Sequence, residues 1–221
     1  QIARDSIRIL SVSADQKASK SLTAAERASS VDVLAGEVRR MLGDNPDLLV
    51  IVSAGNERFR GSFAQYETVD TVSLFRAALL KVKGEGTYHQ RILVVAGSQQ
   101  GNLFWDSWYD GPTTGSNYFT SLTELAAPAQ DLAILGLRVG SAVPVTGADQ
   151  AGTSFSAPMV AGVAAQLLTM DPTLTAAEVA FLAYPDLVPR RQPLNIRWKY
   201  IFWSHRDAHP EHSFSEQSIG G

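Results

Sequence analysis

The chain has 221 residues, 45% hydrophobic and 19% charged, so it can bury the core of one domain or at most two. The formal net charge of -3 gives no reason to expect nucleic acid or an anionic membrane as a partner. No cysteine is present, which excludes disulfides, thiol catalysis and cysteine-ligated metals. No apolar run approaches the roughly 20 residues that a membrane-spanning helix needs.

The predicted elements alternate between strands and helices. Short apolar or β-branched runs predict strands at residues 7–12, 48–52, 91–96, 122–127 and, as one or two strands, 132–145. Helices are predicted at 24–42, 153–170 and 176–184, and capping boxes introduce the first and the third. The segment 72–80 fits either a helix or a strand with a short helix. This alternation predicts an α/β fold with a mostly parallel sheet and helices on both faces.

The remaining segments are expected to be irregular. Residues 104–119, rich in aromatics, Gly and Asp, predict a surface loop with a few anchoring rings. Within a C-terminal extension at 190–221, residues 196–203 fit an edge strand or a docking segment, and a polar tail follows from His205. We therefore expect one domain over 1–189, with 190–221 as an extension.

Ser154 stands in a turn of small residues that opens directly into the apolar run ending at Met170. A helix N-terminus there would place unpaired N–H groups and the positive end of the helix dipole beside its hydroxyl. That environment suits a nucleophile whose substrate oxygen becomes negatively charged, and it suits an ordinary helix cap equally well.

Asn56 follows the predicted strand 48–52, at an end where parallel sheets carry functional loops. Its amide can donate to an oxygen that gains charge, although an Asn after Gly is also common turn chemistry. A nucleophile, helix-terminal N–H groups and an amide donor are together the parts of an acyl-transfer site.

These residues carry a family resemblance. The run Gly152–Gly162 resembles the nucleophile motif of subtilisin-like serine peptidases (subtilases). The run Ser53–Glu57 resembles the oxyanion-Asn segment of that family, Ile9–Ala14 its substrate strand, and Leu125–Pro128 a short motif upstream of the nucleophile. The four runs occur in the family's order and together cover most of residues 7–184.

The resemblance implies that Ser154 is the acyl-forming nucleophile, with Asn56 and the N–H of Ser154 as oxyanion donors. It also implies substrate-binding residues in two segments. The first segment would run beside the substrate backbone and comprises Ser11, Val12 and Ser13. The second would form a wall of the first specificity pocket and comprises Ser53, Ala54 and Gly55.

The sequence departs from the family at three single positions. Ser13 and Ala14 stand where subtilases commonly have Gly, and Met159 stands where they often have His. Side chains at positions 13 and 14 narrow the expected edge of the pocket, so the family's specificity does not carry over.

A larger departure concerns the general base. A serine hydroxyl needs a base oriented by a third group, and subtilases carry Asp and then His before the nucleophile. Asp5 lacks the family's Asp-Ser/Thr-Gly context, and none of the four histidines (His89, His205, His209 and His212) is followed by Gly-Thr. We therefore expect the N-terminal part of the domain, carrying Asp and His, to be missing from this chain. A permuted enzyme that uses a tail histidine with Asp207 is a disfavoured alternative.

No metal or cofactor is predicted from spacing. The tail histidines match no compact metal site, and a tail or tag remnant is the simpler interpretation. The resemblance makes calcium conceivable, with Asp106 and Asp110 as conceivable ligands. Subtilases are often secreted, but nothing at the start of the chain looks like a signal peptide, so no compartment is predicted.

The sequence thus predicts a serine endopeptidase that cleaves peptides or proteins through an acyl-enzyme on Ser154 and is inactive or nearly so alone. The alternative is a non-catalytic subtilase-like module, a pseudopeptidase that binds peptides or regulates. An α/β-hydrolase is disfavoured because Ser156 replaces the second Gly of the Gly-x-Ser-x-Gly elbow.

Overall fold

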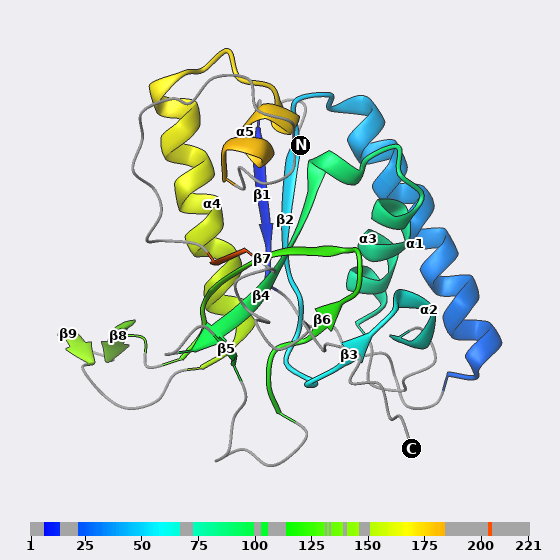
Figure 1. Cartoon of the computed structure of the whole chain (residues 1–221), viewed down its shortest axis with the longest axis horizontal. Coiled ribbons are helices and arrows are strands. Elements are labelled where there is room, and N and C mark those ends of the chain that lie inside the picture. The colour runs from blue at the N-terminus through cyan, green and yellow to red at the C-terminus, as the bar shows by residue number, and fades with distance from the viewer. Residues whose placement is uncertain are drawn as a thin grey trace, which may run out of the picture.

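Parallel strands with helices on both faces make up the fold (Figure 1). This computed structural model describes residues 7–13, 22–66, 73–99, 103–105, 114–130, 132, 134–138, 141–145, 151–183 and 203–204. The main sheet has the order β1-β2-β4-β7-β10, with β5 pairing on β4. The first four strands are parallel, and β10 and β5 add antiparallel pairs. The predicted α/β class with a mostly parallel sheet is confirmed.

The predicted elements recur with shifted ends. The main sheet comprises β1 (Ile9–Val12), β2 (Leu49–Ser53), β4 (Ile92–Gln99), β5 (Leu103–Phe104), β7 (Thr123–Pro128) and β10 (Trp203–Ser204). Two short pairs lie outside it, β3 (Arg60–Gly61) with β6 (Tyr118–Phe119) and β8 (Ile134–Arg138) with β9 (Ser141–Val145). The helices are α1 (Ala24–Asp44), α2 (Phe63–Tyr66), α3 (Leu74–Gly84), α4 (Thr153–Met170), α5 (Ala176–Ala183) and the 3-10 turn η1 (His89–Arg91).

Both capping boxes form as the sequence predicts. The Thr23 side chain accepts from the Glu26 N–H at the start of α1, and Glu26 accepts from the Thr23 N–H in return. The same reciprocal pair joins Thr175 and Glu178 at α5. Each box satisfies donors that a helix N-terminus leaves without intrahelical partners.

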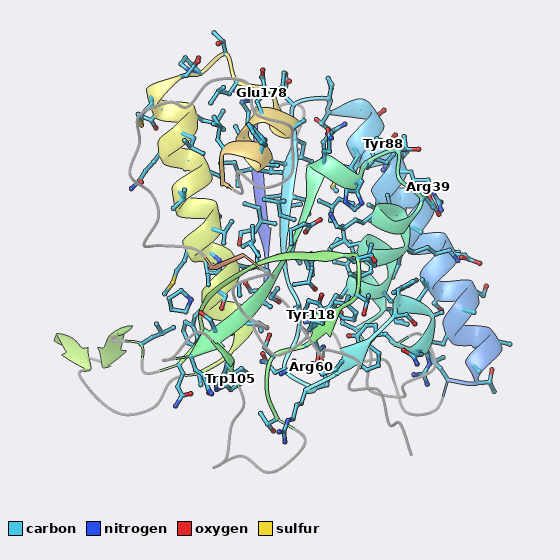
Figure 2. The ribbon with its side chains drawn as sticks, in the orientation of Figure 1. Arg39, Arg60, Tyr88, Trp105, Tyr118 and Glu178 are labelled. Atoms are coloured by element: carbon cyan, nitrogen blue, oxygen red, sulfur yellow. The ribbon has the colours of Figure 1, made fainter. Side chains whose placement is uncertain are left out.

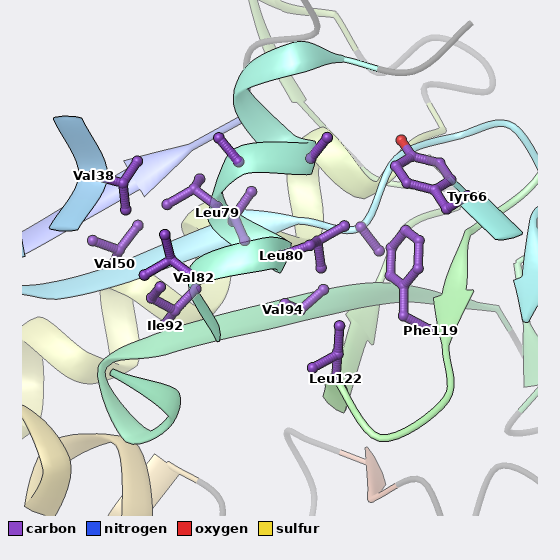
Figure 3. Close-up of a cluster of buried hydrophobic side chains, with 14 of the residues drawn as sticks. Val38, Val50, Tyr66, Leu79, Leu80, Val82, Ile92, Val94, Phe119 and Leu122 are labelled. Carbon is purple, nitrogen blue, oxygen red and sulfur yellow. The ribbon is translucent and has the colours of Figure 1, made fainter. Parts of the chain in front are cut away.

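Alternate residues of the central strands separate two hydrophobic clusters. Val50 and Val52 of β2 face α1 and α3, whereas Leu49 and Ile51 face α4 and α5. Figure 3 shows the first cluster, in which side chains of α3 pack between β2, β4 and α1. A strand buried on both faces reads as a continuous apolar run, which explains why β2 was predictable.

Within the described ranges, none of the helices combines the length and hydropathy that a bilayer crossing requires.

Candidate active site

The site lies at the end of the sheet where the carboxyl ends of β2 and β7 meet the start of α4. In Figure 2 the labels Trp105 and Tyr118 lie at this end of the strands, and the labels Tyr88 and Glu178 lie at the opposite end. Both Trp105 and Tyr118 are buried, so the expected loop at 104–119 does contain anchoring rings.

The start of α4 is tied to the end of β7. The Gly152 N–H donates to the Ala129 carbonyl at 2.7 Å. The buried Ser156 hydroxyl lies 3.0 Å from the carbonyl oxygens of both Ala127 and Pro128. The first turn of the helix therefore has a fixed position relative to the strand.

Thr153 ties the same turn to the loop after β2. Its N–H donates to Oδ1 of Asn56 at 2.9 Å, and its hydroxyl lies 2.8 Å from the same oxygen. The Thr153 oxygen in turn accepts from the Gly55 N–H at 3.1 Å. Because Oδ1 of Asn56 is held on Thr153, the amide nitrogen Nδ2 is directed elsewhere.

Gly152 lies beside both of the expected catalytic residues. A Cβ at Gly152 would lie 3.3 Å from Nδ2 of Asn56 and 3.3 Å from Oγ of Ser154. Asn56 and Ser154 are both half-buried. The structure thus brings Nδ2 of the predicted amide donor and Oγ of the predicted nucleophile close to each other, beside Gly152. Gly152 itself has φ 146, a conformation that side chains rarely adopt.

The predicted pocket wall, Ser53 to Gly55, is buried and its backbone is already hydrogen-bonded. The Ala54 N–H donates to the Val95 carbonyl at 2.8 Å, and the Gly55 carbonyl accepts from the Asn117 N–H at 2.9 Å. These three residues are therefore covered in this structure, and their contact with a substrate stays a prediction.

The predicted substrate strand lies beside this wall. Ser11 is exposed, and Val12 and Ser13 are half-buried. In β1, Val12 pairs with Val52, so continuing the parallel register places Ser13 next to Ser53. Among the described strands β1 pairs only with β2, which leaves its other edge open to an added strand.

His89, the only histidine among the described residues, lies in η1 before β4, at the opposite edge from Ser154. Its Nε2 is 3.6 Å from Oε1 of Glu124, which also forms an ion pair with the buried Lys83 ammonium. Burial and the Lys83 charge lower the pKa of His89. Burial also raises the pKa of Glu124, although Lys83 opposes that shift. His89, which is half-buried, therefore contacts a separate pair of buried charges, Lys83 and Glu124.

Several predicted residues lie outside the described ones. They are Asp5, Asp106, Asp110, Asp207, His205, His209 and His212, so the suggestions that rest on them stay predictions. Within the described part of the chain, no group of three or more His, Cys, Asp or Glu residues is placed to hold a metal ion.

Sequence reasoning missed three side chains that shape the site. Thr153 lies within the run Gly152–Gly162, and its hydroxyl at the start of a helix was the feature that could have revealed its role. Asn117 lies in a short polar run with no periodicity. Arg76 is the one charge in the apolar run 72–80, a signal that a buried partner was needed.

Comparison with known proteins agrees with this geometry. No curated protein matches the sequence. A model of the subtilase family matches residues 1–184, most of the chain. The chain therefore belongs to the subtilase family of serine peptidases.

Proposed function

We propose that this chain supplies the nucleophile and the oxyanion site of a serine endopeptidase. The observation that carries the proposal is the closeness of two groups, since Nδ2 of Asn56 and Oγ of Ser154 each lie 3.3 Å from one point, the position that a Cβ on Gly152 would take. A substrate carbonyl whose carbon faced the serine hydroxyl would then present its oxygen to the amide donor.

The reaction follows from these two groups and a base. Oγ of Ser154 attacks the carbonyl carbon of the scissile peptide bond and gives its proton to the base. The carbonyl oxygen becomes an oxyanion, which accepts from Nδ2 of Asn56 and from the N–H of Ser154. That N–H is in the first turn of α4, where helix geometry provides no acceptor four residues back. The C–N bond then breaks, the leaving amine takes the proton, and water hydrolyses the acyl-enzyme.

The base and its orienting carboxylate come from a polypeptide segment outside the described residues. Subtilases carry Asp and His, in that order, before the serine, so we place this segment N-terminal to β1. His89 cannot serve, because it lies at the other end of β4 in contact with Glu124. This chain alone should therefore be inactive or nearly so.

The substrate is a peptide or protein bound in extended form. The family resemblance supports pairing of the substrate backbone with Ser11 and Val12 of β1 and with Ser13, the residue after it, as a strand added to a sheet. The buried segment Ser53 to Gly55 would then be one wall of the first specificity pocket.

Fluorophosphonate labelling tests the function. The probe forms a bond between its phosphorus and Oγ of an activated serine and releases fluoride. We expect slow or no labelling of the chain alone and fast labelling after addition of a subtilase N-terminal segment that carries Asp and His. Ser154→Ala should abolish labelling. Asn56→Ala should slow it by about 10²–10³-fold, the range known for a subtilisin, a member of this family. Fast labelling of the chain alone would contradict the claim that this chain lacks the base. No labelling in the presence of the added segment would contradict the proposed peptidase activity.

A second candidate is a pseudopeptidase that binds peptides without cleaving them. The position of His89, away from Ser154, favours it. A peptide-binding module has no need of an oxyanion donor, however, and Asn56 is held with its donor group toward Ser154. Binding of extended peptides without labelling under any condition would favour this candidate.

A further inference from the structure

We propose that Asn117 is a positioning residue for the oxyanion amide of Asn56; the proposal rests on the function proposed for that amide. Asn117 precedes β6 and is fully buried. Its side chain contacts the loop that carries Asn56 at residues other than the two, Gly55 and Asn56, that Thr153 contacts. Thr153 fixes the rotation of the amide, whereas Asn117 holds the backbone from which the amide extends.

The loop has a conformation that needs to be held. Gly55 has φ 103 and Arg58 has φ 56, so residues in the left-handed region lie on both sides of Asn56. For a residue other than Gly, such a conformation is strained and persists only where surrounding contacts enforce it. Contacts that enforce it should therefore be found beside Arg58.

The Asn117 side chain provides two of these contacts at once. Its Nδ2 donates to the Ala54 carbonyl at 3.0 Å, and its Oδ1 accepts from the Phe59 N–H at 2.8 Å. One amide thus joins the residues that enter and leave the turn. The ring of Phe59 packs against Tyr66 and Phe119, with ring centroids 5.3 and 5.7 Å apart, so this end of the loop is itself anchored.

Backbone hydrogen bonds next to Asn117 add further contacts with the loop that carries Asn56. The Asn117 N–H donates to the Gly55 carbonyl at 2.9 Å, and the Gly115 N–H donates to the Asn56 carbonyl at 3.1 Å. The Arg58 N–H donates to the Gly115 carbonyl at 2.9 Å. Residues 115–117 therefore pair with the loop on both sides of the Asn56 side chain.

Charge complementarity adds a third side-chain contact. Nδ2 of Asn117 also donates to the carboxylate of Glu57, the residue after Asn56. The buried Arg76 guanidinium lies 3.9 Å from the same carboxylate and donates from Nε to the Ser53 carbonyl at 2.9 Å. A Cβ at Gly55 would lie 2.6 Å from Nδ2 of Asn117 and 2.7 Å from Nη1 of Arg76, which shows how closely these donors pack beneath the loop.

The test substitution is Asn117→Asp, which keeps the shape and the acceptor for Phe59 but removes the donor. The new carboxylate would face the Ala54 carbonyl and the Glu57 carboxylate, so the turn should move. Because a displacement of about 1 Å at a catalytic group can lower a rate by 10²-fold, we expect the limiting rate of fluorophosphonate labelling, measured with the added N-terminal segment, to fall by about 10²-fold. The half-saturating probe concentration should change little, since the groups that bind the probe remain.

A compensating double variant and a matched control variant distinguish a positioning role of Asn117 from a general loss of stability. In Asn117→Asp/Glu57→Gln the glutamine can donate to the new aspartate, and Arg76 keeps a nearby negative charge, so labelling should recover at least in part. Asn45→Asp makes the same chemical change at the end of α1, where Nδ2 donates to the Met41 carbonyl at 2.7 Å. This control should lower thermal stability and leave the labelling rate unchanged.

A second measurement does not depend on activity. The side-chain NH₂ resonances of Asn56 in the ¹⁵N-labelled chain, assigned by their loss in Asn56→Ala, should shift in Asn117→Asp and return toward the original position in the double variant. If Asn117→Asp does not fold, Asn117→Ser replaces it under the same criteria, because serine cannot reach Ala54 and Phe59 together.

Unchanged Asn56 resonances, or an unchanged limiting rate in a folded Asn117 variant, would overturn the proposal. If the unsubstituted protein is not labelled even with the added N-terminal segment, the proposed function fails instead, and the resonance shift alone decides the role of Asn117.

Discussion

Thr153 offers both its backbone N–H and its hydroxyl to one oxygen, Oδ1 of Asn56, at 2.9 and 2.8 Å. With its oxygen fixed twice, the amide places its nitrogen beside Gly152, where one point lies 3.3 Å from both Nδ2 of Asn56 and Oγ of Ser154. The helix that carries the nucleophile therefore also sets the orientation of the donor.

Thr153→Val tests this restraint. Valine has a similar shape but no hydroxyl, so Asn56 loses one bond and the buried Gly55 N–H loses its acceptor. We expect unfolding free energy to fall by about 1–3 kcal/mol, and labelling of Ser154 to slow by more than the roughly tenfold that a single hydrogen bond represents. Thr153→Ser, which keeps the hydroxyl, should be close to the original in both urea denaturation and labelling rate. Equal labelling of the Val and Ser variants would contradict the role of the hydroxyl.

Gly152→Ala should abolish function while the protein still folds. The added methyl would occupy the position between Asn56 and Ser154, and alanine at φ 146 would add strain of about 1–3 kcal/mol. The matched control is Gly162→Ala on the same helix, where nothing lies within 4 Å of the new carbon. That variant should gain roughly 0.5–1 kcal/mol and label normally. Thermal melts and labelling of both variants make the comparison.

Lys83→Met should be strongly destabilising. The Lys83 ammonium is fully buried, donates to the carbonyls of His89 and Ile92 at 2.8 and 2.6 Å, and forms an ion pair with Glu124. Removing it leaves a buried carboxylate uncompensated, a loss of about 3–5 kcal/mol. Lys83→Met/Glu124→Gln should recover much of that stability in urea denaturation. No recovery in the double variant would show that the two carbonyl bonds, not the ion pair, dominate.

His89 should make stability fall in mild acid. Its pKa is lowered in the folded state by burial and by the Lys83 charge, so the folded protein binds its proton less readily than the unfolded chain does. The stability that His89 contributes is therefore present above its unfolded pKa, about 6.5, and is lost as pH falls from there toward the folded pKa. Urea midpoints at pH 7.5 and at about pH 5.5 should differ less in His89→Gln than in the original protein. An equal difference in both proteins would assign the acid sensitivity to other groups.

The fold was predictable where local rules decide. Strands such as β2 are continuous apolar runs, and α1 and α5 begin at capping boxes that the structure reproduces. These signals depend on residues only a few positions apart. The succession of these elements was enough to predict the α/β class.

The segment that forms α3 could not be resolved from sequence, because two of its charges point inward. Arg76 donates to the Ser53 carbonyl, 23 residues earlier in the chain, and Lys83 is buried against Glu124. Charges that face a core break the amphipathic pattern on which helix prediction depends. Asn117 was missed for the same reason: its partners, Ala54 and Phe59, are distant in sequence.

The contact between Thr153 and Asn56 joins residues 97 positions apart, and that separation has a consequence for how the protein folds. Contacts between distant segments form late, because the chain entropy lost in closing a long loop must be offset by other native contacts. A fragment limited to 151–183 would fold at most into helices with an unoriented serine. Ser154 should therefore become reactive only when the whole sheet assembles cooperatively. A partly folded chain would expose no reactive serine.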